Sequence, residues 1–210
     1  MAGRLIDDDP ELAYEHAQAA VRRAGRVDVV REAAGLTAYR TGRFAEALRE
    51  LRTVRRLNGS SEHLAVMADC ERGLGRPERA LALAQEEGAA DLSDEGTVEL
   101  ALVVAGARLD LDQPEAAWAV LNAPGVLAAE GDLAERVALV RVDVLEALGR
   151  TDEATALRHT LPDDEDDEIL VMDLEDEDSG DMLASSSAVG SDEAGHEAPK
   201  ESGGHDAAER

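Results

Sequence analysis

The sequence predicts an all-α protein, and three observations on residues 1–160 support this fold class. These residues are rich in Ala, Leu, Arg and Glu, which are good helix formers. Apolar residues recur at helical spacing, as at Ala45, Leu48 and Leu51, and no alternating pattern bounded by hairpin turns predicts a strand. Glycine and proline interrupt the pattern often enough to predict helices of about 10 to 16 residues. The interruptions fall at Gly42, Asn58-Gly59, Gly73, Gly75, Pro77, Gly88, Pro114, Pro124-Gly125, Gly131 and Gly149.

A short pattern, a turn followed by the start of a helix, recurs along the chain. Four copies occupy residues 42–48, 75–81, 112–118 and 149–154, and a weaker copy occupies residues 9–13. The alanines that align in these copies are separated by 34, 33, 37 and 37 residues; they are Ala13, Ala47, Ala80, Ala117 and Ala154. The turn would reverse the chain between two antiparallel helices, and the alanine would let the two helices approach closely.

This period, turn and alanine resemble the tetratricopeptide repeat (TPR) family, whose unit is a helix-turn-helix of 34 residues. In the unit at 28–61, the residues that match the family pattern are Gly35, Ala38, Tyr39, Gly42, Phe44, Ala47 and Leu51. Arg31 stands where an aromatic usually opens the first helix, and longer loops at 88–93 and 124–131 account for the two wider spacings. The resemblance implies a TPR-like solenoid of helical hairpins over residues 1–160, about four and a half units long.

A closer resemblance is to a group of actinobacterial TPR-containing proteins of unassigned function. It is carried by residues 4–11, 30–35 and 67–78. It implies a bacterial source and adds no activity. Ala13 matches a second-type helix without a preceding first helix, so either the first unit is truncated or residues 1–25 cap the solenoid.

Residues 161–210 differ sharply from the rest in composition. They hold 18 acids and two bases, whereas residues 1–160 hold 29 acids and 19 bases, all of them arginine. Such a segment is expected to be a disordered acidic tail. An apolar run interrupts it, which is either an isolated patch or a short linear motif for a partner. The motif residues would be Ile169, Leu170, Val171, Met172 and Leu174.

The net charge of −26 and the single cysteine exclude several classes of protein. One cysteine forms no intrachain disulfide, so a disulfide-stapled secreted scaffold is excluded. No stretch has the roughly 18 to 20 apolar residues that a membrane span needs. Residues 1–10 lack the apolar core of a signal peptide. We therefore expect a cytoplasmic protein without membrane contact, and its acidity disfavours nucleic acid as a partner.

No motif predicts catalysis, a metal site or a cofactor. The five histidines have no shared ligand spacing, and no HExxH, CxxC or glycine-rich phosphate loop occurs. Cys70 has acidic neighbours on both sides, which disfavours a thiolate, so we expect a small buried packing residue. His63 is expected near a helix cap at the surface. The chain is therefore not expected to be an enzyme.

An arginine band distinguishes residues 22–56, where ten arginines accompany four acids. Arg49, Arg52 and Arg56 share one helix face. The face is either solvated and partly paired with Glu46 and Glu50, or a docking site for an acidic segment, or a contact for nucleic acid. The acidic tail itself, at residues 163–178, is one candidate for that segment and would compete there with an outside partner.

The resemblance also implies a concave surface lined by the first helix of each unit. By position its lining would comprise Glu32, Leu36, Tyr39, Arg40, Ala65, Asp69, Arg72, Leu102, Gly106, Asp143 and Glu146. The segment 98–109 is apolar nearly all round, so it is either fully buried or partly an exposed binding strip.

We therefore expect a non-enzymatic adaptor or assembly scaffold that binds a protein partner through the concave face and the arginine band. The alternative is a helical regulator of a nucleic-acid-associated complex. The candidate partner-binding residues are Leu36, Tyr39, Arg40, Arg49, Arg52, Arg56, Asp69 and Arg72.

Overall fold

The computed structural model describes residues 1–162, and in that range the chain forms helices and no strand. The all-α class predicted from the sequence is confirmed for this part of the chain. The helices are α1 (Ala2–Leu5), α2 (Pro10–Ala24), α3 (Asp28–Arg40), α4 (Phe44–Asn58), α5 (Leu64–Gly73), α6 (Pro77–Leu83), the 3₁₀ helix η1 (Glu87–Asp91), α7 (Asp94–Asp110), α8 (Pro114–Leu121), α9 (Pro124–Leu127), α10 (Gly131–Ala147) and α11 (Thr151–Arg158).

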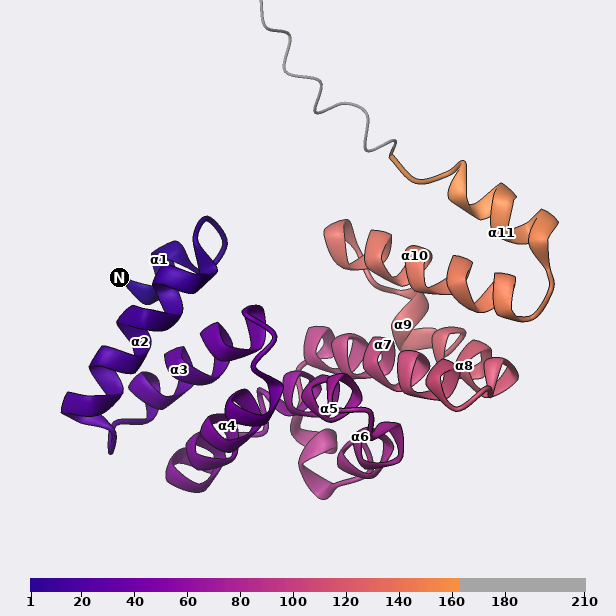
Figure 1. Ribbon diagram of the computed structural model, residues 1–210. Helices are drawn as coiled ribbons and strands as arrows, with labels where there is room; N and C mark the ends of the chain where they lie inside the picture. The colour runs from indigo at the N-terminus through magenta and orange to yellow at the C-terminus, as the bar shows by residue number, and fades with distance from the viewer. Residues whose placement is uncertain (163–210) are drawn as a thin grey trace, which may run out of the picture. The chain divides into compact units, whose positions relative to one another are not determined.

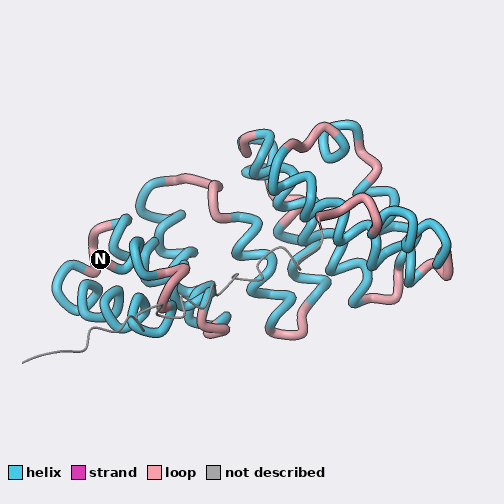
Figure 2. The backbone as a smooth tube through the Cα atoms, turned by 90° about the horizontal axis from the view of Figure 1, so that it is seen from above, coloured by secondary structure: helices cyan, strands magenta, loops and turns pink. Residues whose placement is uncertain are grey.

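Successive helices pack in pairs joined by short turns (Figures 1 and 2). The four pairs are α3 with α4, α5 with α6, α7 with α8, and α10 with α11. Each pair packs on the next, since α4 contacts α5, α6 contacts α7 and α8 contacts α10. The N-terminal α2 packs on α3, and the short α1 packs on both.

The same turn joins the two helices of all four pairs. The second residue after the end of the first helix has a positive φ in each copy, namely 71° at Gly42, 70° at Gly75, 58° at Asp112 and 71° at Gly149. In each copy the amide of the following residue donates to the carbonyl five residues before it, as Arg43 does to Ala38 at 2.8 Å. This is the bonding of a Schellman motif, which ends a helix with a left-handed residue. Each copy of the short sequence pattern therefore adopts the same backbone conformation.

The alanines of the repeat lie where the sequence predicts close helix packing. Each is one turn into the second helix of its pair and is at most 1% exposed; they are Ala47, Ala80, Ala117 and Ala154. Gly35, on the first helix of its pair, also permits the close packing of α3 against α4. A Cβ placed there would lie 2.6 Å from Cδ2 of Leu51. The α3–α4 pair therefore depends on the absence of a side chain at Gly35.

Helix α7 belongs to two hydrophobic clusters at once. Leu100 and Ala107 join the cluster formed by α3 to α6, while Val98, Leu102 and Ala105 join the cluster shared with α8 to α10. This double burial explains why the segment 98–109 is apolar nearly all round. A third, smaller cluster joins α10 to α11.

The two loops expected to be long each contain a short helix. The first contains η1 and the second contains α9. Both are anchored by an apolar contact, since Val126 is 4% exposed and Ala89 packs on the first cluster. The extra residues in the two 37-residue intervals between aligned alanines therefore add apolar contacts to the core between hairpins.

Candidate functional site

A groove lies between α3, α5, α7 and α10, the first helices of the four hairpins. It consists of two adjoining cavities of about 290 and 1070 Å³. They share five wall residues, namely Tyr39, Ala65, Val66, Glu99 and Arg136. Volumes of this order are typical of clefts that bind ligands.

The smaller cavity of the groove, of about 290 Å³, has an apolar wall. Its apolar lining residues are Ala65, Val66, Leu102, Val103, Leu139 and Val140. They come from α5, α7 and α10, so three hairpins contribute to one continuous apolar strip. Removal of such a strip from water would supply the non-directional part of a binding free energy.

A chain of hydrogen bonds crosses the groove from α3 to α7. The hydroxyl of Tyr39 donates to Oδ2 of Asp69 at 2.6 Å. Nη1 of Arg72 donates to Oδ1 of Asp69 at 2.9 Å, and its Nε donates to Oδ2 of Asp110 at 2.8 Å. Gly106 makes room for this guanidinium, because a Cβ there would lie 2.8 Å from it. The polar groups of the groove are thereby held in fixed positions before any ligand arrives.

The charged residues that line the larger cavity, of about 1070 Å³, are mostly acidic. Arg136 of α10 donates to both carboxylate oxygens of Glu99 on α7, so this pair is neutral overall. Glu62, Asp91 and Glu95 also line the cavity, and none of them forms an ion pair within residues 1–162. The charge left over in this part of the groove is therefore negative.

Two ionisable side chains near the groove, those of Tyr39 and Cys70, are held in their uncharged forms. Burial, followed by the hydrogen bond to Asp69, raises the pKa of Tyr39 far above its usual value. Burial, followed by the charges of Asp69 and Glu71, raises the pKa of the Cys70 thiol to about 12. Tyr39 therefore stays a hydrogen-bond donor, and Cys70 stays an un-ionised packing residue, as expected from the sequence.

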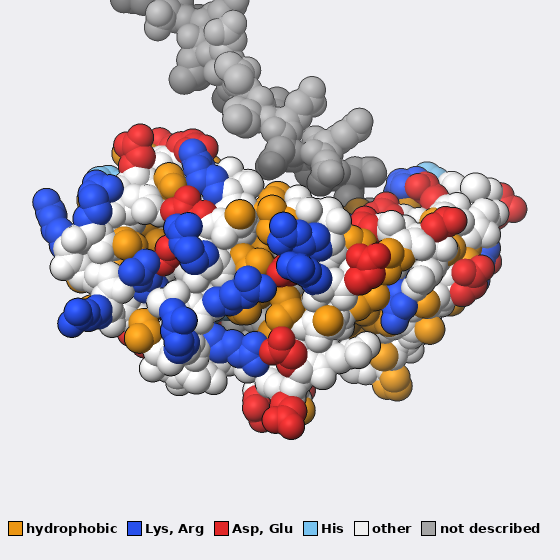
Figure 3. Space-filling view, turned by 60° about the horizontal axis from the view of Figure 1, so that its bottom comes forward, with side chains coloured by type: hydrophobic (Ala, Val, Ile, Leu, Met, Phe, Trp, Pro, Cys, Tyr) orange, Lys and Arg blue, Asp and Glu red, His pale blue; other side chains and the backbone are white. Residues whose placement is uncertain are grey.

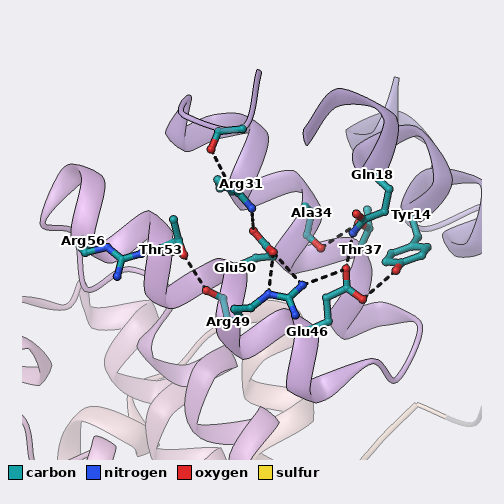
Figure 4. Close-up of polar contacts among 11 residues, drawn as sticks. Tyr14, Gln18, Arg31, Ala34, Thr37, Glu46, Arg49, Glu50, Thr53 and Arg56 are labelled. Atoms are coloured by element: carbon teal, nitrogen blue, oxygen red, sulfur yellow. Dashed lines mark hydrogen bonds and ion pairs between the residues drawn. The ribbon is translucent and has the colours of Figure 1, made fainter. Parts of the chain in front are cut away.

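A second polar surface is built around Glu50, whose side chain is only 5% exposed (Figure 4). Its carboxylate accepts from Arg31 of α3 and from Nη2 of Arg49 at 3.1 Å. Arg31 is held further by Nε, which donates to the carbonyl of Gly25 at 2.7 Å. Two arginines from adjacent helices thus share one buried carboxylate.

The next hairpin repeats this arrangement around Glu71, whose side chain is 1% exposed. Nη2 of Arg52 donates to its Oε1 at 2.9 Å, and Nη1 of Arg76 lies 3.5 Å from its Oε2. The four arginines bound to the two buried glutamates form what we call the arginine row: Arg31, Arg49, Arg52 and Arg76. Arginine side chains are plentiful on the face shown in Figure 3.

The candidate residues predicted from the sequence fall on two surfaces. Tyr39, Arg40, Asp69 and Arg72 line the groove, together with Ala65 and Leu102 of the expected lining. Leu36 instead packs against the first hydrophobic cluster. The other expected lining residues are not in its walls: Glu32, Gly106, Asp143 and Glu146.

Arg49, Arg52 and Arg56 lie on α4 and do not line the groove. The expected pairing within the helix occurs at Arg49, whose Nη2 is 3.7 Å from Glu46. Arg52 reaches across to Glu71 instead, and Arg56 donates to Thr53 at 3.2 Å. The predicted tail motif, Ile169 to Leu174, lies outside the described residues.

Sequence reasoning missed the two buried glutamates, although a signal for each was present. Glu71 follows Leu64 and Ala68 at the spacing of one helix face, and that face is buried. Glu50 stands three residues after the buried Ala47 and next to the buried Leu51. An acid on an apolar stripe indicates a buried carboxylate that needs a cationic partner.

His63 departs from the expected surface position. It is the N-cap residue of α5, as predicted, but its side chain is only 15% exposed and lies 3.1 Å from Oε1 of Glu32. The contact with Glu32 joins two hairpins and reduces the exposure of the His63 ring. The local sequence does not predict it, because the two residues belong to different hairpins.

Comparison with protein-family models, with curated proteins and with solved structures found no match. Within residues 1–162, no helix has the length and apolar character needed to cross a membrane. No group of three or more potential ligand side chains in that range is arranged to hold a metal ion. The geometry of the groove and of the arginine row therefore carries the functional argument.

Proposed function

We propose that the chain is a non-enzymatic adaptor or assembly scaffold whose hairpins form a TPR-like solenoid, and that a protein partner binds in the groove. The recurring left-handed turn and the buried alanine of each hairpin support the repeat architecture. In a solenoid, stacked repeats present the same side of successive units as one extended binding surface. The proposal assigns the groove a binding role and no catalytic step.

The observation that carries this proposal is the continuity of the groove over four first helices. Its apolar strip draws residues from α5, α7 and α10, and its hydrogen-bonded groups link α3, α5 and α7. Because those polar groups are already fixed by one another, a ligand that binds them pays little entropy to order them. A surface of this kind suits an extended or helical segment of another protein.

The charge of the groove indicates which side chains a bound segment would carry. Glu62, Asp91 and Glu95 provide carboxylates without an ion-pair partner in residues 1–162, whereas Arg136 is engaged by Glu99. A segment with apolar side chains for the strip and basic side chains for the carboxylates fits both features. An acidic segment would be repelled at this surface.

The test is a quantitative co-purification from native lysate with two single variants of the full chain. Val66→Arg places a charge in the wall shared by both cavities, whereas Val29→Arg makes the same change at a site that is 61% exposed and outside the groove. We expect the specific partners to be lost with Val66→Arg and kept with Val29→Arg. Circular dichroism checks that both variants remain helical.

Equal recovery of the same partners with both variants would contradict binding in the groove. Equal loss with both, in helical proteins, would place the contact on another surface.

A further inference from the structure

The arginine row is a second polar surface, separate from the groove. Its members lie on α3, on α4 and at the start of α6, and none of them lines either cavity. Four guanidinium groups share the two carboxylates of Glu50 and Glu71, so the row keeps an excess of two positive charges. Glu46, which lies 3.7 Å from Arg49, offsets part of this excess.

The row holds its arginines in place while leaving three of the four open to solvent. The side chains of Arg49, Arg52 and Arg76 are 66%, 54% and 48% exposed although each contacts a carboxylate that is at most 5% exposed. A guanidinium has five N–H donors, and these contacts use only one or two of them. A second anion can therefore bind without displacing the buried glutamates.

Fixed guanidinium groups are better anion receptors than free ones. An arginine on an open surface loses rotamer freedom when it binds a ligand, and that loss opposes binding. Here the anchoring carboxylates have already removed much of that freedom. The planar fork of each guanidinium also matches the geometry of a carboxylate.

The part of this chain that follows Pro162 is itself a strongly acidic candidate ligand for the row. Residues 163–178 contain eleven acids, in two blocks at 163–168 and 173–178. An extended chain spans at most about 3.3 to 3.6 Å per residue, so the second block can lie up to roughly 50 Å from Pro162. Because it is tethered, the segment has an effective concentration that an outside ligand must exceed.

We propose that residues 163–178 dock on the arginine row of the same chain through carboxylate–guanidinium hydrogen bonds. An outside acidic segment then binds the row only by displacing the tail. Nucleic acid is the competing polyanion, and unlike residues 163–178 it has no covalent tether that raises its effective concentration at the row.

The test measures binding of a fluorescent peptide with the sequence of residues 163–178 to two forms of the full chain. One is the natural chain, and the other has the eleven acids of residues 163–178 replaced by their amides, which leaves residues 1–162 untouched. We expect the peptide to bind the amide form about tenfold more tightly, because its own tail no longer occupies the row. Raising the salt concentration from about 50 to about 500 mM should weaken that binding strongly.

Two double variants, made in the amide form, locate the contact. Arg49→Gln with Arg52→Gln removes two charges of the row, whereas Arg22→Gln with Arg23→Gln removes two charges from exposed positions of α2. We expect about a tenfold loss of peptide affinity with the first pair and less than about a twofold loss with the second.

Three results would overturn the proposal. The first is equal peptide affinity for the natural chain and the amide form. The second is an equal loss of affinity with the two double variants. The third concerns competition by a single-stranded DNA, with competitor concentrations expressed per negative charge. If the DNA displaces the labelled peptide at a lower concentration than unlabelled peptide does, the row would be assigned to nucleic acid.

Discussion

At the scale of single residues, two buried glutamates organise one side of the molecule. Glu50 and Glu71 each stand on an apolar stripe and each bind two arginines. A buried carboxylate is costly unless it is paired and hydrogen-bonded, so these arginines are part of the packing as well as of the surface. The arginine band that the composition revealed is therefore only partly a solvated face.

Replacement of Glu71 should destabilise the fold more than replacement of an exposed glutamate nearby. Glu71→Ala removes the partner of Arg52 and Arg76 and leaves a cavity between α4 and α5, so we expect a loss of about 2 to 3 kcal/mol. Glu78→Ala, at an exposed position of α6, should change stability by less than about 0.5 kcal/mol. Urea unfolding followed by circular dichroism measures both. Equal effects of the two substitutions would show that Glu71 is not part of the packing.

The buried thiol of Cys70 should make stability depend on alkaline pH. Its pKa is raised from 9.0 to about 12, mainly by burial, so the folded chain keeps a proton that the unfolded chain loses. This contribution is complete below pH 9.0 and is lost as the pH rises toward about 12. The urea midpoint should therefore fall between about pH 8 and about pH 10.5, and it should fall less in Cys70→Ala. The pKa values of Tyr39 and Tyr14 are raised in the same direction, so both tyrosines contribute to the fall that remains. An identical fall in both proteins would mean that Cys70 ionises as freely in the fold as in the unfolded chain.

At the scale of elements, the hairpin was the most predictable feature. Residues 42–48 and their copies predicted the turn and the buried alanine, because left-handed backbone and close helix packing each demand a particular residue type. The partner of Arg52 was not predictable, because Glu71 lies on the next hairpin and nothing local links the two. The same holds for Arg136 and Glu99, which are 37 positions apart.

The third turn offers a direct test of the repeated backbone conformation. Asp112 is the only residue other than glycine with a positive φ in residues 1–162. Left-handed backbone costs an ordinary residue about 1 kcal/mol, so Asp112→Gly should stabilise the fold by about 0.5 to 1 kcal/mol. The reverse change at the fourth turn, Gly149→Asp, should destabilise it by about the same amount. Calorimetric melting temperatures would decide: a lower melting temperature for Asp112→Gly, or an unchanged or higher one for Gly149→Asp, would refute the shared geometry.

The α3–α4 pair should be sensitive to a single methyl group. Gly35→Ala sets a Cβ 2.6 Å from Cδ2 of Leu51, so the helices must separate or Leu51 must move, at a cost of about 1 to 3 kcal/mol. Gly3→Ala in α1 makes the same change where no atom lies within 4 Å. Its effect should be neutral or slightly stabilising, because alanine favours the helix. A Gly35→Ala variant as stable as the Gly3→Ala variant would mean that α3 and α4 do not pack this closely.

At the scale of the whole molecule, stacking of the hairpins creates the groove. The sequence located Tyr39, Arg40, Asp69 and Arg72 in its walls, because first helices of successive repeats share one side. It missed Val66 and Arg136, whose positions depend on how far each hairpin rotates against the next. It also assigned the arginines of α4 to a band apart from the concave face, and none of Arg49, Arg52 and Arg56 lines the groove, because the second helix of a hairpin presents its exposed face to a different surface.

Photo-crosslinking from defined positions of the full chain tests the central proposal, that the groove binds a protein partner, most directly. A photoreactive residue would replace Val66 in the groove in one protein and Leu57, which is 48% exposed and outside the groove, in the other. The account predicts a discrete crosslinked partner from position 66 and none from position 57, with a site of attachment in a segment that carries apolar and basic residues. The same partner crosslinked from both positions, or from position 57 alone, would contradict it.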